Sequence, residues 1–220
     1  MARFSFSGDS VSLNKGDVIS LEKNYGEVIK NFHIGLGWDI LHDKNADLDA
    51  YVLEMDENDK ILDIIYYGQL NSKDGAIKHT GDNLTGAGEG DDEVINIAVD
   101  RINPKVTKLV VAVTIYTANI NFSEVQNAFV RLVDAYDETE FVRYDLSNEA
   151  GKNYTMHMAD IYRQDSGRWD FTAIGQATQH KSIREFANSI ASNTIGGVNT
   201  SNSNGGSNNR GGGFFRNLFR

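Results

Sequence analysis

The chain of 220 residues contains no cysteine and only one proline. Without cysteine, neither a disulfide bond nor a thiolate metal site can form. The proline, Pro104, lies in RINPKV just before a long apolar segment, where it can lead into a strand without removing a ladder hydrogen bond. The N-terminal MARFSFSGDS lacks the apolar run of a signal peptide or a membrane span, so we expect a cytoplasmic protein.

Basic residues are in deficit, because 21 Lys and Arg stand against 31 Asp and Glu and give a formal net charge of −10. A general nucleic-acid binder needs a basic face to meet phosphates, so this class is excluded. Catalytic signals are also scarce. The histidines are scattered, and their spacing supports no Ser–His–Asp arrangement. GAGEG lacks the lysine and the following helix of a phosphate loop. We therefore expect a binding protein and not an enzyme.

Most of the chain has the composition of β-strands. Segments rich in β-branched and aromatic residues are separated by short turns that carry Gly, Asn or Asp, as in ILDIIYY, KLVVAVTIYT, NAFVRLVDAY, FVRYDL and RWDFTAIG. No β–helix–β alternation indicates a parallel sheet. The pattern predicts an all-β fold over residues 1–191, an antiparallel two-sheet β-sandwich with one or two short helices. Helical spacing of Ile183, Phe186, Ala187 and Ile190 predicts a helix in HKSIREFANSI, and NFSEVQ favours a short helical turn.

The composition changes abruptly after residue 191. Residues 192–213 are almost entirely Gly, Ser, Asn and Thr, which is typical of a flexible linker. The chain then closes with FFRNLFR, whose apolar and basic side chains we interpret as a docking peptide: Phe214, Phe215, Arg216, Leu218, Phe219 and Arg220. Its expected target is a protein partner or an anionic membrane surface. The alternatives are that this end packs back on the sandwich or has no role.

Acidic residues and glycines are concentrated in GDNLTGAGEGDDE, residues 81–93. Carboxylates this dense repel one another unless a cation lies among them, and glycines allow the backbone to turn sharply. Hard oxygen ligands on such a loop suit calcium better than zinc or copper. A solvated acidic loop is the alternative. The candidate ligands here are Asp82, Asn83, Asp91, Asp92 and Glu93, with Thr85 and Glu89 nearby.

A second acidic cluster surrounds the segment NADLDAYVLEM. Asp39 closes GLGWD, and Asp47 and Asp49 follow where a strand is expected to begin. Residues two apart in a strand point to the same face, so Asp47 and Asp49 can present their carboxylates side by side. An EF-hand is excluded, because Leu48 stands where the loop needs glycine and no amphipathic helix flanks it.

In these motifs the chain resembles the TerD domain of tellurite-resistance and general-stress proteins. The resemblance covers roughly residues 1–180 and rests on SLNKGDVISLEK, GLGWD, DLDA, HTGDNLTGAGEGDDE, NAFVRLVD, and DIYR with GRWDFTAIGQ. The family is known as a calcium-binding β-sandwich whose D-x-D and GDN…GDDE segments hold the ions. The resemblance implies that Ca²⁺, in two sites, is held by Asp39, Asp47, Asp49, Asp82, Asn83, Asp91, Asp92 and Glu93. The family pattern has Glu-Leu-Tyr-Arg where this chain has Asp160 to Arg163, and the turn that follows is one residue longer.

Four further residues carry smaller expectations. His79 precedes the acidic loop and is expected to stabilise a turn, with contact to the metal ligands as the alternative. Arg131, Arg143 and Arg163 lie on strand-like segments, where we expect them to pair with acids.

As a whole the sequence predicts a calcium-binding module of the stress-response and tellurite-resistance type, which can also form a homo-oligomer. Two other functions stay open: a calcium-assisted hydrolase or phosphoryl-transfer enzyme, and a structural or cargo protein recruited to a shell or polymer by its tail.

Overall fold

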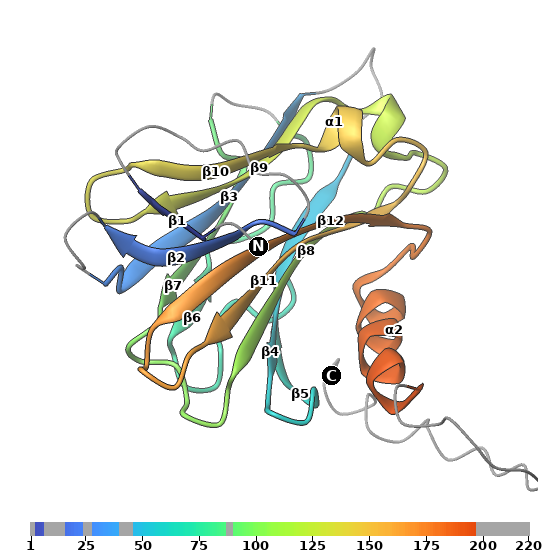
Figure 1. Cartoon of the computed structure of the whole chain (residues 1–220). Coiled ribbons are helices and arrows are strands. Elements are labelled where there is room, and N and C mark those ends of the chain that lie inside the picture. The colour runs from blue at the N-terminus through green and yellow to red at the C-terminus, as the bar shows by residue number, and fades with distance from the viewer. Residues whose placement is uncertain (1–2, 7–15, 24–27, 40–45, 87–89, 197–220) are drawn as a thin grey trace, which may run out of the picture.

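The computed structural model describes residues 3–6, 16–23, 28–39, 46–86 and 90–196. It forms two facing β-sheets (Figure 1). The larger sheet has the strand order β1 (Arg3–Phe6), β2 (Val18–Lys23), β12 (Trp169–Thr178), β11 (Thr155–Arg163), β8 (Lys108–Ile115), β4 (Leu48–Met55) and β5 (Ile61–Ile65). The smaller sheet has the order β10 (Glu140–Asp145), β9 (Gln126–Asp134), β3 (Asn31–Asp39), β7 (Glu93–Ala98) and β6 (Ile77–His79).

The strand pairs confirm the all-β sandwich that the sequence predicts. Paired strands are antiparallel throughout the described sheets, except that β1 runs parallel to β2. In the described part of the chain, no helix is long and apolar enough to cross a membrane. The expected linker and docking peptide, residues 192–213 and 214–220, lie outside the described residues from 197 onward.

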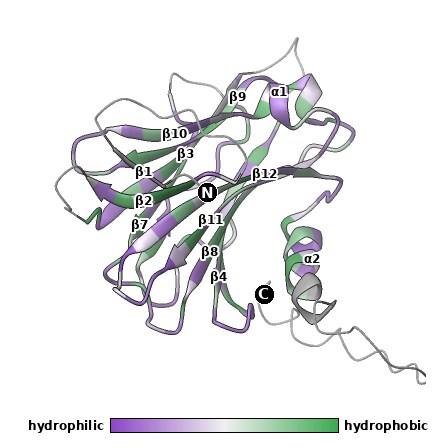
Figure 2. Cartoon of the chain, viewed as in Figure 1, coloured by the Kyte–Doolittle hydropathy of each residue, from purple (hydrophilic) through white to green (hydrophobic). Residues whose placement is uncertain are grey.

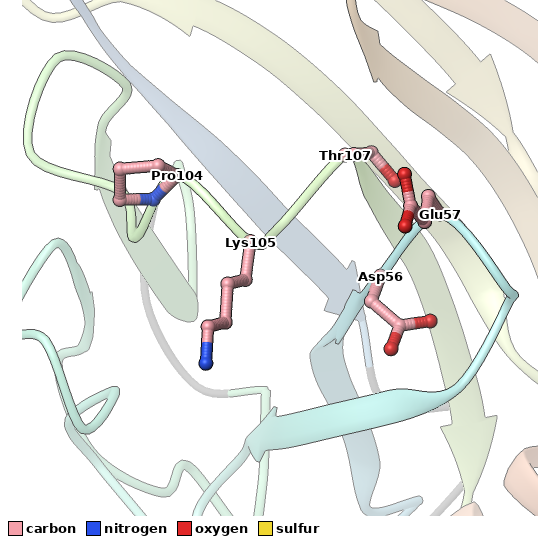
Figure 3. Close-up of a pocket in the computed structure, with 5 residues that line it drawn as sticks. All are labelled: Asp56, Glu57, Pro104, Lys105 and Thr107. Carbon is pink, nitrogen blue, oxygen red and sulfur yellow. The ribbon is translucent and has the colours of Figure 1, made fainter.

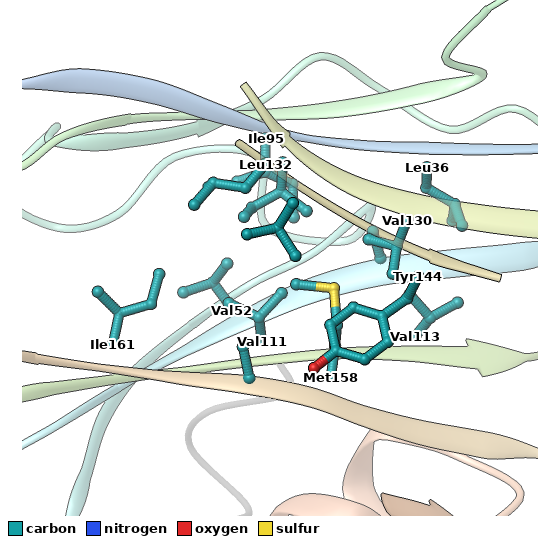
Figure 4. Packing of buried hydrophobic residues seen from close by; sticks show 14 of the residues in the cluster. Leu36, Val52, Ile95, Val111, Val113, Val130, Leu132, Tyr144, Met158 and Ile161 are labelled. Carbon is teal, nitrogen blue, oxygen red and sulfur yellow. The ribbon is translucent and has the colours of Figure 1, made fainter. Parts of the chain in front are cut away.

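The main core lies between the two sheets. Apolar side chains of the smaller sheet, such as Leu36, Val130 and Leu132, face Val52 and Val111 of the larger sheet (Figure 4). Each is fully buried. Burial of one such side chain contributes about 1.5–3 kcal/mol, so this layer is the main source of stability for the sandwich.

A second apolar layer lies between the larger sheet and helix α2 (Ile183–Gly196). Phe186 of this helix packs edge-on against Tyr51 at a ring distance of 5.9 Å and against His157 at 5.4 Å. In Figure 2, α2 carries both apolar and hydrophilic residues, as expected of a helix with one buried side. Because β4 lies between two apolar layers, all of its residues are buried.

The helices agree with the sequence in place and differ in extent. The helix predicted in HKSIREFANSI is α2, but it begins at Ile183 and continues past residue 191 to Gly196. The short turn expected in NFSEVQ is the 3-10 helix η1 (Phe122–Glu124). Asn121 and Glu124 form a capping box at its N-terminus. Helix α1 (Leu146–Glu149), capped by the Asp145 side chain, was not expected.

Candidate metal centre

Three carboxylates meet where β4 begins. Asp47 and Asp49 flank Leu48 at the start of the strand, and Asp82 reaches them from the loop between β6 and β7. One carboxylate oxygen from each of the three lies within 4.8 Å of the other two. Backbone contacts to the 115–117 turn hold Asp47, because its N–H donates to Thr117 Oγ1 and its carbonyl accepts from Tyr116 N, both at 2.8 Å. We call Asp47, Asp49 and Asp82 the acidic cluster.

Much of the acidic cluster is removed from water without being neutralised. Asp49 is only 1% exposed, Asp47 is half-buried and Asp82 is exposed. Among the described residues, Asp47 Oδ1 and Asp49 Oδ2 are buried and have no hydrogen-bond partner. Such atoms are costly, since a buried charge is normally paired or bound to a metal.

The same arrangement makes these groups weaker acids than usual. Burial, followed by the charges of Glu93, Asp47 and Asp82, raises the pKa of Asp49 to about 8. Burial and the charges of Asp82 and Glu93 raise the pKa of Asp47 to about 6. Both shifts mean that the protein alone disfavours the charged form of the cluster. A cation among the three carboxylates would remove that penalty.

Two other expected ligands, Asn83 and Asp92, are held by hydrogen bonds. Asn83 Oδ1 accepts from the N–H groups of Thr85 and Gly86, both at 3.1 Å, and so shapes the loop after Asp82. Asn83 Nδ2 donates to Asp92 Oδ1 at 3.0 Å, and Asp92 Oδ2 accepts from Trp38 N at the same distance. Asp92 therefore links the loop to β3.

Asp91 lies across the outer side of β3 in an ion pair. Both of its oxygens meet the Arg131 guanidinium, at 2.7 and 2.9 Å. The pair needs glycine in the GLGWD motif, because a Cβ at Gly35 would overlap the Asp91 carboxylate and one at Gly37 would overlap the Gly90 carbonyl and the Phe129 ring. The structure thus gives Asp91 a cationic partner, Arg131.

Two more expected ligands, Asp39 and Glu93, do not belong to the acidic cluster. Asp39 Oδ2 accepts from Asn127 Nδ2 at 2.6 Å, at the far end of β3. Glu93 is fully buried at the start of β7, where Oε2 accepts from Ala50 N at 2.9 Å. The structure therefore brings together Asp47, Asp49 and Asp82, with Glu93 on the backbone beside them, and places Asp39, Asp91 and Asp92 in separate hydrogen-bonded settings. Glu89 lies outside the described residues.

The expected arginine pairs form in two of three cases. Arg131 binds Asp91 and Glu140, and Arg143 binds Glu140 at 2.6 Å while lying over the Phe129 ring. Arg163 is different: its guanidinium donates to the carbonyls of Val106, Ile102 and Asn103 and lies over the Trp169 ring. Arg163 therefore fastens the 102–106 turn, and the prediction of an acidic partner is not met by these contacts.

A second buried acid, which the sequence analysis did not predict, lies at the other end of β4. Glu54 is 3% exposed, and its Oε1 has no hydrogen-bond partner within the described part of the chain. It faces Asp63 as its register partner on β5. Burial, then the charges of Asp74 and Asp63, raise the pKa of Glu54 to about 8, and Lys73 opposes this shift.

Close to this end, a pocket of about 350 Å³ is lined by Asp56, Glu57, Pro104, Lys105 and Thr107 (Figure 3). None of the five is buried. Since all of these polar groups retain access to water, nothing in the pocket lining requires a ligand.

Comparison with known proteins supports the same family throughout the described sandwich. Residues 10–189 match the TerD domain. The chain is 41% identical over 175 residues to the tellurium resistance protein TerD of Serratia marcescens, covering 76% of this chain and 90% of that one. It is 37% identical over 196 residues to the stress response protein SCP2 of Bacillus subtilis, covering 80% of this chain and 97% of that one.

A solved structure shows the same fold. The crystal structure of a TerD homologue from Streptomyces coelicolor superposes with a TM-score of 0.65 at 22% identity, over 72% of this chain and 95% of that one. This likeness establishes the architecture, and the sequence matches establish the relationship. The resemblance carried by the GLGWD, DLDA and HTGDN motifs is confirmed, and the chain belongs to the TerD family.

Proposed function

We propose that the acidic cluster binds calcium. The observation that carries this proposal is the pair of buried carboxylate oxygens on Asp47 and Asp49 that lack a partner among the described residues, beside a third carboxylate on Asp82. All of the donors are hard oxygens, and no histidine belongs to the cluster. This donor set fits calcium and not zinc or copper.

We expect calcium to be preferred over magnesium. Magnesium requires a small octahedral shell of six oxygens, whereas calcium accepts more ligands with looser geometry. The loop that carries Asp82 contains Gly81 and Gly86, with φ values of 125° and 60°. A loop built on such turns offers backbone carbonyls and water access to complete a large shell. The ion would also link β4 to this loop.

A second calcium ion, expected from the family, remains a proposal. Asp39, Asp92 and Glu93 each accept hydrogen bonds, but each carboxylate oxygen has more than one lone pair. These residues could therefore join a second site without losing their present partners. A measured stoichiometry of two calcium ions per chain would support the second site, and a stoichiometry of one would contradict it.

We further propose that the protein acts in tellurite resistance or stress response, as its relatives are named, and does so as a cytoplasmic binding or scaffolding module without catalysis. The docking peptide, Phe214 to Arg220, would recruit a protein partner or an anionic membrane. A fusion of residues 193–220 to an inert fluorescent protein tests the docking role, which is wrong if the fusion captures no partner and floats with no liposome.

Titration calorimetry of the full chain tests the central proposal. Calcium should bind with measurable heat that a chelator abolishes, with one or two ions per chain, and magnesium should bind much more weakly. A flat calcium titration would contradict the proposal.

A further inference from the structure

The backbone around the acidic cluster is held by one buried carboxylate. Glu93 Oε2 accepts from Ala50 N at 2.9 Å, and Oε1 accepts from Asn83 N at 3.4 Å. Ala50 directly follows Asp49 in the chain, and Asn83 directly follows Asp82. A single side chain at the start of β7 therefore spans the two segments that carry the cluster, and it fixes the distance between them.

Glu93 in turn faces the imidazole of His79, and both side chains are fully buried. His79 Nδ1 accepts from Gly81 N at 3.0 Å. A backbone N–H can only donate, so Nδ1 carries a lone pair and the ring proton must be on Nε2. His79 Nε2 lies 3.4 Å from Glu93 Oε2, close enough for electrostatic attraction, but it makes no hydrogen bond within the described part of the chain. The turn at Gly81 thus sets the tautomer that places the ring proton on the nitrogen nearer to Glu93.

This contact gives His79 two roles at once. Its Nδ1 shapes the turn that leads to Asp82, as the sequence predicts for a turn-stabilising histidine. Its Nε2 points at the carboxylate that joins this loop to β4. We propose that His79 is a positioning residue for the metal centre, which holds Glu93 so that Asp49 and Asp82 meet at the spacing that calcium needs.

The inference rests on the proposed calcium site. It adds that the affinity for calcium depends on a residue that does not touch the ion. Residues behind the ligands of a metal centre orient those ligands, and replacing them commonly weakens metal binding. The alternative is that His79 contributes only to packing, in which case its loss changes folding stability and leaves the metal centre intact.

The chain offers a matched control. His157 is also buried and also faces a carboxylate, with Nε2 2.8 Å from Asp160 Oδ1. It lies on β11 beneath α2, where it contacts Phe186. His157→Phe therefore removes a buried histidine–carboxylate contact, here a hydrogen bond, at a place outside the acidic cluster.

The experiment compares the wild-type full chain with His79→Phe, His79→Gln and His157→Phe. Calorimetry gives the calcium affinity, thermal unfolding in chelator gives the stability without metal, and the luminescence lifetime of bound Tb³⁺ gives the number of waters on the ion. We expect His79→Phe to weaken calcium binding roughly tenfold or more. We also expect about one additional water on Tb³⁺, because a misplaced carboxylate leaves its position to solvent. His79→Gln, whose amide can donate toward Glu93, should recover part of the affinity.

His157→Phe should lower the unfolding temperature without changing calcium affinity or the water count. Equal calcium affinities for wild type and His79→Phe would overturn the inference and leave the proposed function standing. If His79→Phe does not fold, His79→Leu, which also cannot donate toward Glu93, takes its place, and unchanged affinity with an unchanged water count there overturns the inference as well. A wild-type chain that binds neither calcium nor Tb³⁺ overturns the proposed function together with this inference.

Discussion

The two ends of β4 each contain a buried acid with an unpartnered oxygen, but their surroundings differ. At the start of the strand, Asp49 lies beside Asp47 and Asp82, whose charges add to its own. At the other end, Glu54 faces Asp63, which is satisfied by Lys73 and Gln69. Several acids that lack partners together create a place for a cation. A single buried acid whose neighbours already have hydrogen-bond partners favours its protonated form instead.

Replacing one acid at each end should separate these two roles most strongly. Asp49→Asn keeps the size of the side chain and removes a charged ligand, so we expect calcium affinity to fall by about 100-fold or more. Glu54→Gln should leave calcium affinity unchanged. Calorimetry of both variants makes the comparison, and equal losses at the two ends would break it.

At the Glu54 end of β4, the contribution to folding stability should depend on pH and not on calcium. The pKa of Glu54 is raised from 4.5 to about 8 in the folded protein, so the folded state binds this proton more tightly than the unfolded state does. Stability therefore falls as pH rises from about 4.5 to about 8, by up to roughly 1.4 kcal/mol per pH unit from this group. Glu54→Gln should remove that slope and stabilise the protein at the upper end of the range.

Urea unfolding of wild type and Glu54→Gln across this range, in chelator, measures the slope. Asp63→Asn is a comparison and not a neutral control: it removes an acid that has hydrogen-bond donors, and it also removes one of the charges that raise the pKa of Glu54, so the slope from Glu54 should become smaller without disappearing. A wild-type slope that survives in Glu54→Gln would show that another group carries the proton.

Asp91 extends the comparison to an expected ligand that already has a cationic partner. Its bidentate pair with Arg131 predicts that Asp91→Ala destabilises the fold, by about 1–3 kcal/mol, because Arg131 loses a partly buried partner. We expect calcium affinity to change far less than in Asp49→Asn. A loss of affinity as large as that of Asp49→Asn would identify Asp91 as a direct ligand.

Gly35 supplies an effect of similar size and a way to cancel it. Gly35→Ala would place a Cβ against the Asp91 carboxylate and should destabilise the protein by about 1–3 kcal/mol. In the Asp91→Ala background the overlap is absent, so adding Gly35→Ala should cost clearly less. Chemical denaturation of the four proteins gives the coupling, and additive losses would mean that the two residues do not meet as described.

The sequence predicted the fold class, the helix at Ile183 and the family, because strand composition, helical spacing and the GLGWD and HTGDN motifs are local features of the chain. The sequence could not show which of the eight expected ligands cluster together and which have other partners. Asp91 and Asp49 are both aspartates in acidic motifs, and only the pairing of β3 with β9 brings Arg131 against Asp91. Glu54 was missed for the same reason, because its raised pKa depends on acids that β5 and the turn at Asp74 bring close to it.

The central claim is that the acidic cluster carries a negative charge that an ion, and not the protein, neutralises. Thermal unfolding of wild type and Asp49→Asn, with calcium and with chelator, tests it at about pH 9, above the pKa of Asp49 of about 8. In chelator the variant should be the more stable protein, because it lacks a buried charge without a partner. In calcium the advantage of the variant should shrink by about 2 kcal/mol, because the wild type gains about 2.7 kcal/mol at a hundredfold excess over its Kd and the variant, which binds more weakly, gains much less. The same stability difference in both conditions would contradict the account.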